Sequence, residues 1–131
     1  MRFTERELTV ALEGAAKSVL AVQDKTVRKG RRTADEAWAA LTRYQRFQLL
    51  DGLGDQVLPV LMSLPDVEVE VGTRPTFTDA QISAAVEERL GAGKGIKRKV
   101  VLQGRIALVK IALEAVPPRQ DPDALIVPDH L

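Results

Sequence analysis

The chain has 131 residues, of which 45% are apolar, and it carries 19 Lys and Arg against 18 Asp and Glu. That length and apolar share predict one domain with an ordinary core and exclude wholesale disorder. The chain has no Cys and a single His, His130, which excludes disulfide scaffolds, thiolate metal sites, cysteine nucleophiles and most histidine-dependent catalysis. We therefore expect a non-enzymatic protein that uses no cofactor.

The near-zero net charge conceals an uneven distribution of charge along the chain. Residues 1–50 carry ten basic and six acidic side chains, residues 51–93 carry two and eight, and residues 94–131 carry seven and four. This basic, acidic, basic order indicates either that segments of the fold complement one another or that basic surface is exposed to a partner.

A first helix is predicted from about Glu5 to the region of residues 24–28. Thr4 and Glu7 have the spacing of a capping box, in which each side chain accepts a hydrogen bond from the other residue's backbone N–H. The basic run 28–32 around Gly30 should end this helix. Apolar side chains recur every three or four residues, as on the buried stripe of a helix, at Leu8, Leu12, Ala15, Val19 and Val22.

A second capping box, Thr33 with Glu36, predicts another helix that continues as far as Leu50. The glycines and aspartates of residues 51–55 favour a break, so we expect a separate short helix from Asp55 to Leu64. The buried face of the longer helix should consist of Ala37, Trp38, Leu41, Tyr44 and Phe47.

Apolar and acidic residues alternate from Asp66 to Val71, which is the period of a half-buried strand. Gly72 can turn the chain and residues 74–77 can return beside it, so a small β-hairpin is expected over residues 66–77. The aligned carboxylates could hold a divalent cation. A solvated edge that resists strand addition is the favoured reading.

A third capping signature, Thr78 with Gln81, begins a helix that should end at Gly91. The last helix is expected up to Val116, and apolar residues cover most of its circumference. Gly104 in its middle indicates a close crossing with another helix. A helix that is apolar nearly all round is either the central helix of a bundle or part of an oligomer interface.

These elements together predict a mainly α protein, a four- to five-helix bundle with a small β-hairpin inserted near residues 66–77. Residues 1–116 should form the single helical domain, and residues 117–131 an extended tail that packs back on it through Ala124–Val127. The N-terminus lacks a signal-peptide core, and no stretch is apolar enough to span a bilayer. We therefore expect a cytoplasmic protein that does not associate with a membrane.

One local pattern opposes helix electrostatics. Lys97, Arg98 and Lys99 crowd the expected N-terminus of the last helix, where cations oppose the macrodipole. Either the acidic residues 66–70 neutralise them, or the helix begins later, near Val100, or they bind an anion such as phosphate. The loop lacks the Ser or Thr of a P-loop, so a nucleoside triphosphate site is not expected. The candidate anion- or nucleic-acid-binding residues are Arg28, Lys29, Arg31, Arg32, Lys94, Lys97, Arg98 and Lys99.

The apolar last helix favours a small non-catalytic protein that acts through protein–protein contacts and self-associates. The partner would be a second copy or another protein. The alternative is a nucleic-acid-associated protein that binds phosphates through the basic segments 28–32 and 94–99. An enzyme or a small-ligand binder with its site in the bundle core ranks third.

Overall fold

The computed structural model describes residues 1–91, 93 and 95–120, and the regular secondary structure in this part of the chain is entirely helical. The mainly α prediction is therefore confirmed. The helices are α1 (Glu5–Gln23), α2 (Lys25–Arg28), α3 (Ala34–Ala40), α4 (Arg43–Ser63), α5 (Asp79–Leu90) and α6 (Ile96–Ala115).

Capping boxes fix where four of these helices begin. The three boxes expected from the sequence are present, and a fourth begins α4. Because Thr42 caps a new helix, α3 ends at Ala40, and the expected continuous helix from residue 34 to residue 50 is wrong. The four pairs are Thr4 with Glu7, Thr33 with Glu36, Thr42 with Gln45 and Thr78 with Gln81.

The expected break at residues 51–55 does not occur, because α4 continues through it to Ser63. Asp55 therefore lies inside a helix and caps nothing. Two glycines and Pro59 each weaken α4 locally. Burial outweighs that cost, since each large apolar side chain removed from water contributes roughly 1.5–3 kcal/mol. The buried residues of α4 are Leu53, Gly54, Val57, Val60 and Leu61.

Residues 66–77 form no β-hairpin, so that prediction is wrong. The expected turn is present, because Gly72 has a φ of 84° and the Thr73 N–H donates to the Glu70 carbonyl at 3.0 Å. The chain beyond the turn pairs with the C-terminal segment instead. The Gly72 N–H donates to the Arg119 carbonyl and the Arg119 N–H to the Thr73 carbonyl, each at 2.8 Å. Pro75 has no N–H to offer to a hairpin ladder.

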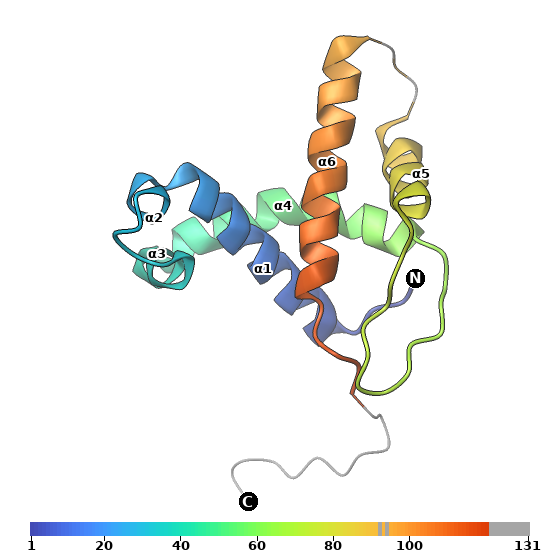
Figure 1. The fold of residues 1–131 in the computed structure, drawn as a ribbon, viewed down its shortest axis with the longest axis horizontal. Helices are drawn as coiled ribbons and strands as arrows, with labels where there is room; N and C mark the ends of the chain where they lie inside the picture. Colours follow the sequence, from blue (N-terminus) through green and yellow to red (C-terminus); the bar gives the residue numbers. More distant parts are fainter. Residues whose placement is uncertain (92, 94, 121–131) are drawn as a thin grey trace, which may run out of the picture.

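Helices α1, α4, α5 and α6 enclose the larger core, and α3 covers a smaller one with Trp38 (Figure 1). The side chains of the larger core are almost all aliphatic, as the composition predicts. Its most deeply buried large residues are Val57, Val60, Leu61, Leu64, Val86, Val109 and Val116.

Helices α1 and α6 approach each other closely at Gly14, which lies directly against Ala115. A Cβ atom at Gly14 would collide with the Cβ of Ala115. Gly104, in contrast, has no atom within 4 Å of the place where its Cβ would be. The expectation that Gly104 marks a close helix crossing is wrong, and Gly14 has that role. Beyond this crossing the two helices diverge (Figure 1).

Arg119 holds the C-terminal segment on the start of α1. Its guanidinium donates from Nη2 to Glu7 Oε1 at 3.0 Å and from Nε to Glu7 Oε2 at 3.2 Å. Burial by itself raises the pKa of Glu7, but the hydrogen bonds from Arg119 and Thr4 outweigh it and hold the pKa below its ordinary value. The expected packing of Ala124–Val127 concerns residues outside the described part of the chain.

Candidate functional site

The diverging parts of α1 and α6 flank an open, apolar hollow of about 230 Å³, which we call the α1–α6 notch. Gly14 and Ala115 lie where the two helices meet, so their close contact sets the inner end of the notch. The lining residues are Ser18, Val19, Val22 and Gln23 from α1, and Gly104, Ala107, Leu108 and Ile111 from α6.

The N-terminal half of α6 has apolar residues on two opposite faces. Leu102 and Ile106 pack against the core that α5 shares. Val100 and Gly104 lie on the opposite face. Each is two positions from Leu102, and two positions are about half a turn of a 3.6-residue helix. Val100 is 65% exposed, and the neighbouring Val101 is 47% exposed. This second face lies unpartnered beside the notch.

Val22, on the opposite wall of the notch, is 70% exposed, although its spacing predicts a buried position. The periodicity identifies the stripe correctly, but α6 covers α1 only near the crossing. Tyr44 and Phe47 depart from expectation in the same way, being 67% and 62% exposed on the first turns of α4. Exposed apolar side chains that cluster indicate an interaction surface, whereas single ones do not.

The first basic segment lies at the end of the α1 wall, on and after α2. Arg32 is used structurally, because its Nη2 contacts Asp24 Oδ2 at 2.7 Å and its Nε donates to Thr26 Oγ1 at 2.6 Å. Hydrogen bonds from Thr26 and then from Arg32 hold the pKa of Asp24 well below its usual range. Arg28, Lys29 and Arg31 are exposed.

The second basic segment lies at the free end of the α6 wall. Helix α6 begins at Ile96, and its N-cap, Gly95, provides no side-chain hydrogen bond. The suggested later start near Val100 is therefore wrong, and Lys97 and Lys99 are exposed in the first turn. Arg98 folds back and donates from Nη2 to the Gly91 carbonyl at 3.0 Å. Lys94 lies outside the described residues.

The two basic segments are not brought together. Beyond their crossing, α1 and α6 form two diverging arms with the notch between them (Figure 1). The segment around α2 lies at the end of the α1 arm, and the first turn of α6 lies at the end of the α6 arm. Residues 66–70 do not neutralise Lys97–Lys99 either, since no ion pair of the described residues joins these segments. Asp66, the first of these acidic residues, lies instead near Met1, whose amino group is 3.5 Å from Asp66 Oδ1.

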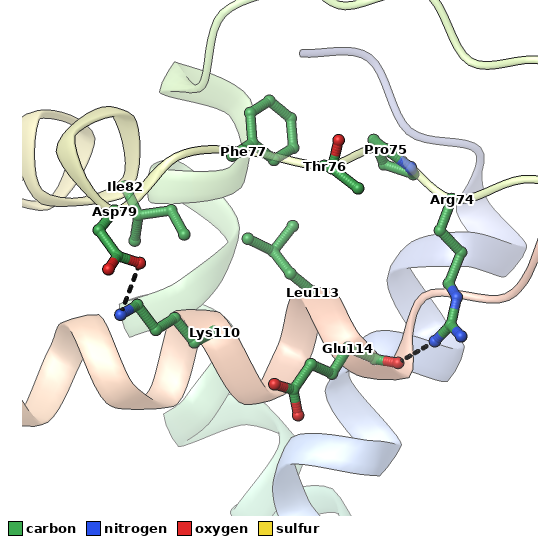
Figure 2. Close-up of a pocket in the computed structure, with 9 residues that line it drawn as sticks. All are labelled: Arg74, Pro75, Thr76, Phe77, Asp79, Ile82, Lys110, Leu113 and Glu114. Carbon is green, nitrogen blue, oxygen red and sulfur yellow. Dashed lines mark hydrogen bonds and ion pairs between the residues drawn. The ribbon is translucent and has the colours of Figure 1, made fainter.

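A second hollow, of about 450 Å³, lies between α6 and the chain that leads into α5 (Figure 2). Its apolar side is formed by Phe77, Ile82 and Leu113. The cations on its rim are already bonded, because Lys110 pairs with Asp79 at 2.9 Å and Arg74 Nη1 donates to the Glu114 carbonyl at 2.6 Å. The cations of this hollow are therefore less available to a polar ligand than the exposed cations of the two basic segments.

Within the described ranges, no helix has the length and apolar character needed to cross a membrane. The same residues contain no group of three or more His, Cys, Asp or Glu side chains that could hold a metal ion. No family pattern, no characterised protein and no solved structure gives a match to this chain.

Proposed function

We propose that this chain is a small non-catalytic helical protein that acts through protein–protein contacts and self-associates through the α1–α6 notch. The observation that carries the proposal is the unpartnered apolar surface formed by Val100 and Val101 on one arm and Val22 on the other. Covering such a surface contributes about 25 cal/mol for each Å² of apolar area removed from water. No other element of the described chain covers it.

The charged groups support a binding role over catalysis. The carboxylates with lowered pKa values, Glu7 and Asp24, are each engaged in holding the fold together. Glu7 ties the C-terminal segment to α1 through Arg119, and Asp24 caps α2. A carboxylate so engaged is a poor general acid or base, because its proton affinity is already lowered by bonds that the fold requires.

Double replacement of Val22 and Val100 by Ser tests the proposal. It removes apolar area from both arms without adding charge, and we expect the mass measured by light scattering to fall to the monomer value of 14.3 kDa. Tyr44→Ser is the matched control, because Tyr44 is equally exposed but lies on α4. A double variant that associates as strongly as the wild type would contradict the role of the notch.

A second candidate, nucleic-acid binding, is favoured by one observation. The exposed cations of the two basic segments lie at the tips of both arms, where a polyanion could contact them together. Against it, the surface between the tips is mostly apolar and offers phosphates no charged donors. Retention on DNA that falls steeply with salt would favour this candidate. Retention that is absent at low salt would exclude it.

A further inference from the structure

Exposed cations flank the notch, although no charged side chain of the described residues lines it. Of the six basic side chains in residues 14–34 on the α1 side, Lys17 pairs with Asp35 and Arg32 with Asp24. The other four are exposed. On the α6 side, the exposed cations among the described residues 91–113 are Lys97 and Lys99, since Lys110 pairs with Asp79 at the second hollow. A partner that combines apolar side chains with negative charge therefore complements both the notch and the cations beside it. Two notches facing each other would instead bring like charges together, which is unfavourable.

The same chain displays a segment with the complementary character. Residues Asp66–Val71 alternate acidic and apolar side chains and form neither helix nor strand. Glu68 and Glu70 are exposed and form no ion pair among the described residues, and Val71 is 58% exposed. We call residues 66–71 the acidic segment.

The acidic segment cannot reach the notch of its own molecule. At one end, the N-terminal amino group contacts Asp66 and donates to the Leu64 carbonyl. At the other end, the Gly72 N–H donates to the Arg119 carbonyl. Figure 1 shows the segment on the opposite side of α6 from the notch. The two complementary surfaces can therefore meet only between different copies.

We infer that the protein self-associates head to tail, with the acidic segment of one copy in the α1–α6 notch of the next. This inference rests on the proposed self-association and specifies its partner surface. Glu68 and Glu70 meet the cations at the arm tips, and Val71 covers apolar notch surface. Because the two surfaces differ and every copy carries both, copies can close into a ring, of which a reciprocal pair is the smallest, or add in an open chain.

Charge exchange between the two surfaces tests the inference. The segment variant combines Glu68→Lys with Glu70→Lys, and the notch variant combines Lys29→Glu with Lys97→Glu. Below about 0.1 M salt, where the Debye length exceeds about 10 Å, sedimentation should find each variant monomeric by itself. Their equimolar mixture should regain at least twice the monomer mass, because the unaltered acidic segment of the notch variant then meets the unaltered notch of the segment variant.

The matched control combines Asp51→Lys with Asp55→Lys, which changes the net charge equally at two exposed positions on α4. This control should associate like the wild type. Recovery in the mixture also demonstrates that both variants are folded. If the segment variant associates unaided, or if the mixture stays monomeric, the head-to-tail inference is overturned while self-association stands. A wild type that is monomeric in every condition contradicts the proposed function itself.

Discussion

Gly14 lies directly against Ala115, and the absence of a Cβ at Gly14 lets the middle of α1 lie close to the C-terminal end of α6. A side chain at position 14 would have to displace the backbone of one helix, because Ala115 has no flexible atoms that could move aside. The notch is thus a consequence of a missing Cβ in α1. The apolar surplus of α6 is exposed because the two helices separate beyond this point.

We predict opposite effects of adding a methyl group at two glycines. Gly14→Ala should lower the free energy of unfolding by about 1–3 kcal/mol, because it overpacks the crossing. Gly104→Ala should raise it by about 0.5–1 kcal/mol, because Gly104 is an exposed position inside a helix with open space around it. Urea denaturation of both variants measures the difference. Equal effects at the two positions would contradict the assigned crossing.

The second prediction concerns the Glu7–Arg119 pair. Since the folded-state pKa of Glu7 is lowered, its ionised form stabilises the protein above the unfolded-state pKa, and this contribution is lost as the pH falls through the folded-state pKa. Arg119→Ala should therefore cost about 1–3 kcal/mol at neutral pH, where a charge-assisted hydrogen bond is removed.

At a pH below the folded-state pKa, Glu7 is protonated in both proteins, so the cost of Arg119→Ala should largely disappear. Urea denaturation of the wild type and of Arg119→Ala, at pH 7 and at the lowest pH at which both are folded, measures the cost at each pH. A cost that does not depend on pH would mean that Arg119 acts only by packing.

Helix electrostatics at the start of α6 provide a third prediction. Lys97→Glu and Lys99→Glu should each raise the free energy of unfolding by roughly 0.3–1 kcal/mol, because carboxylates suit a helix N-terminus that has no capping side chain. Arg105→Glu, in the middle of α6, is the control and should change stability less. Thermal denaturation that shows a lower stability for Lys97→Glu would indicate that Lys97 has a stabilising partner in the fold.

The sequence predicts well where local chemistry determines the outcome. Three capping boxes and the Gly91 terminus of α5, with its φ of 71°, are confirmed, because each depends on residues a few positions apart. The break expected at residues 51–55 fails because burial of Val57 and Leu61 against distant helices outweighs the local cost of glycine.

The candidate site could be predicted only in part, because it depends on contacts between remote residues. The apolar surplus of α6 is visible in the sequence, but its exposure depends on the contact of Gly14 with Ala115. Likewise, the alternation of residues 66–71 suggests a strand, whereas the chain just beyond it bonds to Arg119, 47 residues from Gly72. Local periodicity contains no information about either pairing.

Sedimentation equilibrium of the wild-type chain, over a range of concentrations at low and at high salt, tests the central claim most directly. We predict a mass that rises above 14.3 kDa with concentration at low salt and returns toward it as salt screens the acidic segment from the notch. A mass of 14.3 kDa at every concentration and salt condition would contradict it.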